Sequence, residues 1–107
     1  MNLKVSQLKL KIIWEKTYLG LAVDQVNLNQ QYAITPYYFW PKTEAWEQLK
    51  LELEPKLWLS DEEKIKILKL AGDSIDYWLS YRNTKTVNDF KREYPIIGVL
   101  QLYHIGL

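Results

Sequence analysis

Residues 8–26 read LKLKIIWEKTYLGLAVDQV, and this stretch decides the fold. From Leu8 to Trp14 apolar and charged side chains alternate, with Ile13 as the exception, and a period of two is typical of a half-buried β-strand. Residues 18–26 form a second β-rich run after a short polar connection. Because the two runs lie so close together in the chain, they predict an antiparallel hairpin.

Two helices are predicted after the hairpin. Thr43 is a good N-cap, and Pro55 ends a first helix of about three turns. The residues Ser60-Asp61-Glu62-Glu63 form a capping box in front of apolar residues at helical spacing, which predicts a longer helix from about Asp61 to about Tyr81. Gly72 lies inside this second helix, where glycine is unfavourable, so we expect a close neighbour there.

The remaining segments complete a small mixed fold. We expect residues 27–31 to be a polar loop, and the aromatic run 37–40, held between two prolines, to be a short extended segment. Residues 86–94 suggest one or two helical turns, and 96–105 a late strand that returns to the sheet. The prediction is an α+β fold, a small antiparallel β-sheet packed against two α-helices, with Trp residues between the layers. Gly20 and Ala22 leave one face of the second strand nearly bare, and we expect something large, such as a Trp or a helix, to pack there.

Chain length, net charge and amino-acid composition exclude several classes of function. A chain of 107 residues is expected to form a single domain, 1–107. With 14 Lys+Arg and 13 Asp+Glu the net charge is +1, which argues against an undirected, charge-driven grip on nucleic acid. The absence of cysteine excludes a disulfide framework and a thiolate zinc site. Since no long apolar run or targeting segment is visible, we expect a soluble protein that makes no membrane contact.

The sequence contains no recognisable catalytic motif. His104 is the sole histidine and has no serine or acidic residue near it in sequence. The carboxylates show neither a calcium-loop spacing nor a Glu-x-x-His pair, and the four glycines are too scattered to form a phosphate loop. We therefore predict no catalytic, cofactor-binding or metal-binding residue, and no enzyme activity.

Two groups of residues and Asp24 leave both structural and functional interpretations open. Asp24 is either a functional carboxylate or, as we favour, an acid at a strand end that accepts hydrogen bonds from backbone amides of the next loop. The aromatic run 37–40 is either core or a stacking platform for unpaired bases, and the lysines are either phosphate contacts or a solvated face. The candidate residues for binding RNA or a partner are Tyr38, Trp40, Lys42, Lys50, Lys56, Lys9 and Lys11.

Several blocks of the chain together resemble a known family. They are AVDQV (22–26), YYFWPK (37–42), AWEQLKLELE (45–54), PKLW (55–58) and IDYW (75–78). These blocks resemble the plastid-specific ribosomal protein 3 family over a core of about 8–78. The chain departs from the family at 55–58, where the family usually has Ser before Lys and Pro in place of Leu57. Residues 79–107 match weakly, so we treat them as a C-terminal extension to which no function is transferred.

The resemblance implies a structural, non-enzymatic component of the small ribosomal subunit of plastids or cyanobacteria. Such a protein would support translation by contacting small-subunit ribosomal RNA and other small-subunit ribosomal proteins, in the plastid stroma or the cyanobacterial cytoplasm, without a cofactor or small-molecule substrate. Because the net charge is near zero, we expect few phosphate contacts and anchorage that rests largely on protein neighbours and on the aromatic surface.

Two other function classes remain open. One is a protein–protein adaptor unrelated to the ribosome, which an exposed Tyr/Trp patch would also serve. The other is a small-molecule binding module or enzyme that uses Asp24, Trp40 and Glu44 around a pocket.

Overall fold

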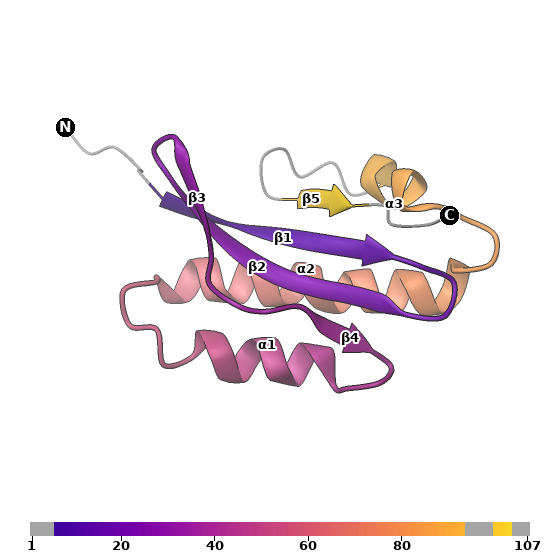
Figure 1. The fold of residues 1–107 in the computed structure, drawn as a ribbon, viewed down its shortest axis with the longest axis horizontal. Coiled ribbons are helices and arrows are strands. Elements are labelled where there is room, and N and C mark those ends of the chain that lie inside the picture. The colour runs from indigo at the N-terminus through magenta and orange to yellow at the C-terminus, as the bar shows by residue number, and fades with distance from the viewer. Residues whose placement is uncertain (1–5, 94–99, 104–107) are drawn as a thin grey trace.

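The computed structural model describes residues 6–93 and 100–103 (Figure 1). One sheet lies over two long helices, which run lengthwise and contact each other (Figure 1). The predicted fold class, α+β with a small antiparallel sheet packed against two helices, is confirmed. In chain order the elements are β1 (Ser6–Trp14), β2 (Leu19–Asn27), β3 (Gln30–Ala33), β4 (Tyr38–Trp40), α1 (Ala45–Leu53), α2 (Asp61–Tyr81), α3 (Val87–Glu93) and β5 (Leu100–Tyr103).

The predicted hairpin forms the centre of the sheet. Strands β1 and β2 pair antiparallel from Ser6 opposite Asn27 to Trp14 opposite Leu19. Both β3 and β4 pair antiparallel with β2, which gives a strand order β3-β2-β1-β5 with β4 also on β2. Of the late strand expected at 96–105, residues 100–103 are described and form β5, which pairs parallel with β1; residues 96–99 and 104–105 lie outside the described residues. The sheet is therefore not wholly antiparallel, because the chain crosses over through the helices before β5.

The core lies between the inner face of the hairpin and the helices. Leu10, Ile12, Leu19 and Leu21 are fully buried there, as is Trp78 of α2. The Trp78 indole Nε1 also donates a hydrogen bond of 2.6 Å to the carbonyl oxygen of Glu15, in the turn that joins β1 to β2. The long helix is thereby fixed to the hairpin both by apolar packing and by this partly buried hydrogen bond.

Not every tryptophan lies between the layers. Trp14 is buried against the rings of Tyr77 and Phe90, as expected for a residue between sheet and helices. Trp58, by contrast, is 65% exposed in the connection between α1 and α2. The prediction is wrong for Trp58 because its segment extends beyond the end of α1 and has no layer above it.

The two long helices begin differently. For α2 the predicted bounds are confirmed, and the Ser60 hydroxyl accepts a hydrogen bond of 3.1 Å from the Glu63 amide as a capping box requires. For α1 the predicted N-cap is wrong. Thr43 turns back to donate its hydroxyl to the Phe39 carbonyl oxygen, so Glu44 takes the cap position without a side-chain cap bond.

The polar loop expected at 27–31 is also wrong, because most of it is strand. β2 continues to Asn27 and β3 starts at Gln30, which leaves a two-residue turn. Leu28 in that turn has a φ of 57°, in the left-handed region that hairpin turns of this length usually fill with Asn, Asp or Gly. An exposed leucine gives no turn signal, so the sequence did not indicate the hairpin.

Two glycines mark close packing. A Cβ on Gly20 would lie 2.8 Å from Cε1 of Phe39, so the large group expected on the bare face of β2 is this phenylalanine ring. A Cβ on Gly72 would lie 3.6 Å from Nε1 of Trp46, which is ordinary contact. The neighbour expected at Gly72 is therefore the indole of α1, and it leaves room for a methyl group.

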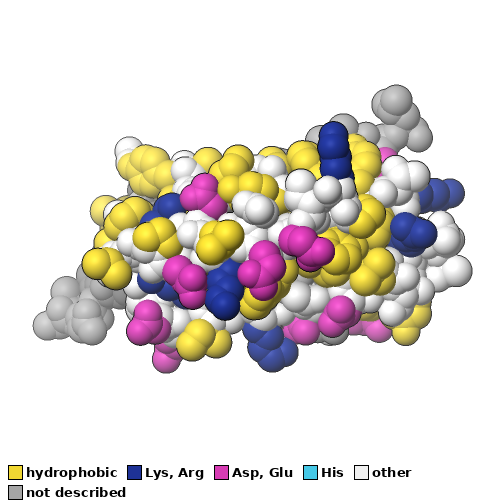
Figure 2. Space-filling model, turned by 90° about the horizontal axis from the view of Figure 1, so that it is seen from below, with side chains coloured by type: hydrophobic (Ala, Val, Ile, Leu, Met, Phe, Trp, Pro, Cys, Tyr) yellow, Lys and Arg dark blue, Asp and Glu magenta, His cyan; other side chains and the backbone are white. Residues whose placement is uncertain are grey.

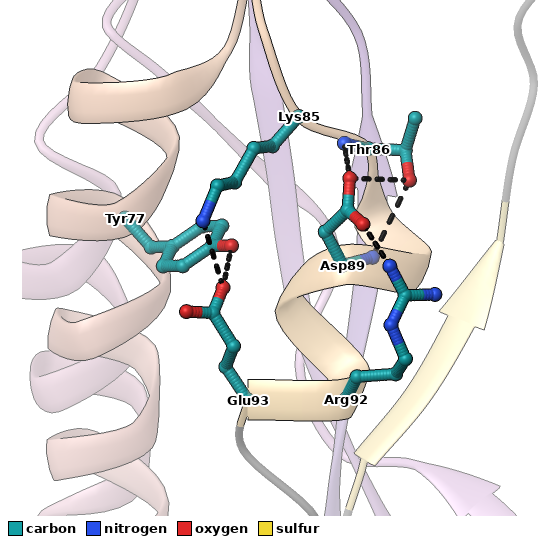
Figure 3. A network of polar contacts seen from close by, with 6 residues as sticks. All are labelled: Tyr77, Lys85, Thr86, Asp89, Arg92 and Glu93. Atoms are coloured by element: carbon teal, nitrogen blue, oxygen red, sulfur yellow. Dashed lines mark hydrogen bonds and ion pairs between the residues drawn. The ribbon is translucent and has the colours of Figure 1, made fainter.

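A polar network ties α3 to α2 (Figure 3). The Tyr77 hydroxyl donates to Oε2 of Glu93, and Nζ of Lys85 lies 3.3 Å from the same oxygen. Val87 and Phe90 of α3 are buried in the same core as the hairpin. The hydrogen bond from Tyr77 and the charge of Lys85 hold the pKa of Glu93 below its ordinary value.

The first turn of α3 has a network of its own. The Thr86 amide donates a hydrogen bond of 2.8 Å to Oδ2 of Asp89, and Arg92 forms an ion pair with the same carboxylate (Figure 3). The bond from the Thr86 backbone is the largest cause that lowers the pKa of Asp89. Both carboxylates of α3 therefore favour the folded state only when they are ionised.

Acidification should loosen α3 before it loosens the hairpin. Because the pKa values of Asp89 and Glu93 are lowered in the folded chain, their stabilisation is full above the ordinary carboxyl range and is lost as the pH falls through the lowered values. Amide hydrogen exchange, corrected for the intrinsic rate, should show weaker protection of α3 at pH 3 than at pH 6. Protection of α3 that stays equal at the two pH values would contradict this, and the central turns of α2 serve as the internal control.

Candidate functional site

Neither a metal-binding cluster nor a membrane-spanning helix is found among the described residues. Among residues 6–93 and 100–103 no group of three His, Asp or Glu side chains is placed to hold a metal ion. In the same part of the chain, no helix has both the length and the apolar content needed to cross a membrane. His104 lies outside the described residues.

Strand alternation divides the candidate residues between two faces. Tyr38 and Trp40 of β4 lie opposite inner residues of β2 and pack against the core from the helix side. Lys9 and Lys11 of β1 lie opposite Asp24 and Ala22, on the outer face of the sheet. The structure therefore does not bring the seven candidates together, because neighbouring residues of a strand point to opposite faces.

The outer face is organised around an ion pair. Nζ of Lys11 lies 2.7 Å from Oδ1 of Asp24, and the two side chains are 13% and 8% exposed. Nε2 of Gln31 donates a hydrogen bond of 2.7 Å to the other carboxylate oxygen. The expectation that Asp24 accepts from loop amides is wrong, because β2 continues to Asn27 and places Asp24 inside the sheet.

Aromatic rings continue this face beside Lys11. Nζ of Lys11 lies 5.1 Å above the centroid of the Tyr37 ring, a cation–π distance. The Tyr37 ring stacks on Phe39 at 6.1 Å, and Phe39 meets Tyr18 edge to face at 5.5 Å. We call Tyr18, Tyr37 and Phe39 the aromatic strip. Sequence reasoning selected Tyr38 and Trp40 instead, although the bare Gly20 opposite Phe39 was a signal that the odd-numbered rings lie outside.

The other candidate lysines lie on the α1 side, and two of them have local contacts. Nζ of Lys56 lies 2.8 Å from the carbonyl oxygen of Glu52 and 3.7 Å from its Oε2, while the Tyr38 hydroxyl donates to Oε1 at 3.2 Å. Burial, and then the Glu52 charge, raises the pKa of Tyr38. Nζ of Lys50 lies 5.6 Å above the Trp46 ring, and Lys42 is exposed after β4.

A groove of about 290 Å³ opens where β4, α1 and α2 meet. The indole Nε1 of Trp46 donates a hydrogen bond of 2.8 Å to the Leu68 carbonyl oxygen, which fixes this ring between the helices. Figure 2 views the molecule from the α1 side, where acidic and hydrophobic side chains are interspersed. The groove is lined by Trp40, Glu44, Trp46, Glu47, Gly72, Ile75 and Asp76.

The expected pocket around Asp24, Trp40 and Glu44 is not formed. Trp40 and Glu44 do line the groove, but Asp24 faces the other side of the sheet, where it pairs with Lys11. The parity of β2 and β4 explains the difference, since Leu19 and Trp40 share the inner face whereas Asp24 has the opposite parity.

Comparisons with known proteins agree on one family. Residues 34–81 match the family described as plastid and cyanobacterial ribosomal protein (PSRP-3/Ycf65). A probable small ribosomal subunit protein cS23 of Synechococcus sp. (strain JA-3-3Ab) is 40% identical over 82% of this chain and 89% of its own length. Small ribosomal subunit protein cS23 of Gracilaria tenuistipitata var. liui is 32% identical over 85% of this chain and 92% of its own. Small ribosomal subunit protein cS23z of Arabidopsis thaliana is 40% identical over 68% of this chain and 45% of its own.

Loss of the Lys11 ammonium should destabilise the sheet. Lys11→Met leaves the Asp24 carboxylate buried without its cation, which should lower the free energy of unfolding by about 3 kcal/mol. The matched variant Lys9→Met, on the same face, should cost less than about 1 kcal/mol. Urea denaturation measures both. Equal effects of the two substitutions would show that the Lys11–Asp24 pair has no special role.

Proposed function

The chain belongs to the plastid and cyanobacterial ribosomal protein family (PSRP-3/Ycf65), and we propose that it is a structural, non-enzymatic component of the small ribosomal subunit. The observation that carries this proposal is the similarity, over most of the chain, to proteins named as components of that subunit. The resemblance seen in the sequence motifs is confirmed. Nothing in the comparisons supports the alternative of an adaptor unrelated to the ribosome.

The relatives indicate where such a protein works. They come from cyanobacteria, a red alga and a land plant, so the site of action is the plastid stroma or the cytoplasm of a cyanobacterium. We propose that the chain acts there as one domain, with residues 79–107 as an extension of the family core. Val87 and Phe90, from the extension, support this because they are buried in the same cluster as the hairpin.

We further propose that the outer face of the sheet is turned toward ribosomal RNA. Lys9 lies on this face, and the aromatic strip beside Lys11 offers rings for base stacking, worth about 1–3 kcal/mol per base. Lys42 is exposed after β4 and is a second candidate for a phosphate contact. Lys11 itself is held by Asp24, so its share in phosphate binding is smaller.

The remaining candidates suit protein neighbours better. Tyr38 and Lys56 share the Glu52 carboxylate, and Lys50 lies over the Trp46 ring. Charges that are already compensated gain little from a phosphate, whereas aromatic and mixed-charge surfaces are typical of protein interfaces. We propose that Tyr38, Trp40, Lys50 and Lys56 belong to contacts with other small-subunit ribosomal proteins.

Sedimentation tests the proposal. A tagged copy expressed in a cyanobacterium should migrate with the small subunit in a sucrose gradient. The purified chain alone should bind small-subunit RNA weakly at physiological salt, with a log–log salt slope of about −2, because few lysines are free to neutralise phosphates.

Two results would count against these statements separately. A tagged chain that stays at the top of the gradient, while a known small-subunit protein sediments, would remove the ribosomal assignment. Tight binding of the isolated chain to the RNA at physiological salt would leave the assignment intact but contradict anchorage by protein neighbours. The double variant Lys9→Gln/Lys42→Gln should weaken the residual RNA binding, and Lys66→Gln/Lys69→Gln on α2 provides the charge-matched control.

A further inference from the structure

The groove between β4, α1 and α2 has an unusual charge pattern. Its rim carries Glu44, Glu47 and Asp76, which are all exposed and form no ion pair with the described residues. Most other carboxylates of the described chain do have a cation; among them are Asp24, Glu52, Glu62, Asp73, Asp89 and Glu93. The N-terminus of α1 accounts for Glu44 and Glu47, since carboxylates there oppose the helix dipole. Asp76 lies well inside α2 and has no such reason.

The rest of the groove is aromatic. Two indoles, Trp40 and Trp46, line it together with Gly72, which has no side chain to fill the space in front of Trp46. Trp46 is held by its bond to Leu68 and therefore presents a fixed ring; Nζ of Lys50, which is not part of the groove lining, lies 5.6 Å from the centroid of this ring. The indole Nε1 of Trp40 is buried and has no acceptor among the described residues. The groove thus combines two aromatic rings with three carboxylates that form no ion pair among the described residues.

We propose that this groove binds an arginine side chain presented by a segment of a neighbouring protein. A guanidinium group is planar, stacks on aromatic faces and donates several hydrogen bonds to carboxylates. It therefore matches both the aromatic rings and the carboxylates of the groove lining. The three carboxylates would repel an RNA phosphate, and within the described residues they do not come together as a metal site.

This inference rests on the proposed function in one respect: the arginine-bearing segment comes from a neighbouring protein of the small ribosomal subunit. Proteins that bind ribosomal RNA carry basic side chains, so a neighbour in the subunit would have arginines to offer. The outer face of the sheet, with Lys9 and the aromatic strip, then faces RNA, while the groove on the opposite side faces protein. The two faces would hold the chain between different kinds of neighbour.

Nuclear magnetic resonance of the full chain tests the groove directly. The chain has five tryptophans, each with one indole N–H signal. Titration with the blocked tripeptide Ac-Gly-Arg-Gly-amide should shift the signals of Trp40 and Trp46 and leave that of Trp58 in place. The same peptide with citrulline, which is neutral and nearly isosteric with arginine, should cause no saturable shift.

Matched variants separate the groove from general negative charge. Glu47→Gln/Asp76→Asn should lower the affinity for the arginine peptide by about fivefold or more, because two rim charges are removed. Glu54→Gln/Glu62→Gln removes the same charge from carboxylates outside the groove lining and should leave the affinity unchanged. Glu62 lies 14 residues before Asp76 on α2, which is about 21 Å along the helix.

Several outcomes of the titration would contradict the proposal. An absence of shifts at Trp40 and Trp46, equal shifts with the citrulline peptide, or equal weakening by the two double variants would overturn the proposal. Saturable shifts of the same two signals by a short oligoribonucleotide, stronger than those by the arginine peptide, would assign the groove to RNA and overturn it as well. Because the titration uses the isolated chain, its failure is distinct from a failure of the sedimentation test.

Discussion

The pairing of β1 with β2 is the constraint on which the rest of the structure depends. Their antiparallel register turns the even-numbered residues from Leu8 to Trp14 and the odd-numbered residues from Leu19 to Val23 toward the helices, so that apolar side chains line the inside. The outside carries Lys9, Lys11 and Asp24 together with apolar residues such as Ile13. Strands β3 and β4 pair with β2, and β5 pairs with β1. Helix α2 packs against both β1 and β2. The bond from Trp78 to Glu15 fixes the long helix to the hairpin turn. A shift of one residue in this register would move the apolar side chains of the shifted strand from the core to the outer face of the sheet.

The same alternation decides which chemistry each face can offer. In β4 it turns Phe39 outward over Gly20, while Tyr38 and Trp40 turn inward to the α1 side. The outer face gains a lysine and an aromatic strip, whereas the helix side gains a groove with a negatively charged rim. On the proposed assignment of the two faces, phosphate is attracted to Lys9 on one and repelled by the carboxylates on the other, so a protein with a net charge of +1 would still distinguish RNA from protein neighbours.

The sequence predicts best the elements in which apolar residues recur at regular spacing. The hairpin and α2 have long, regular apolar patterns and local start signals, and both were correct. The failures concern residues whose role is set by distant parts of the chain. Asp24 looked like a strand end because β3 was hidden by an atypical leucine turn, and Thr43 looked like a cap because its bond to Phe39 is not visible in sequence. The parallel direction of β5 depends on a crossover, which no local pattern encodes.

The candidate site was only partly predictable for the same reason. The aromatic run and the lysines are visible in the sequence, but which of them share a face is not.

We propose that the chain sits in the small ribosomal subunit between RNA and protein. A map of that subunit at side-chain resolution is the decisive measurement. We expect it to show the face of Lys9 and Phe39 against RNA and the groove at Asp76 occupied by protein. Absence of the chain from the subunit, or a groove that faces the RNA backbone, would contradict it.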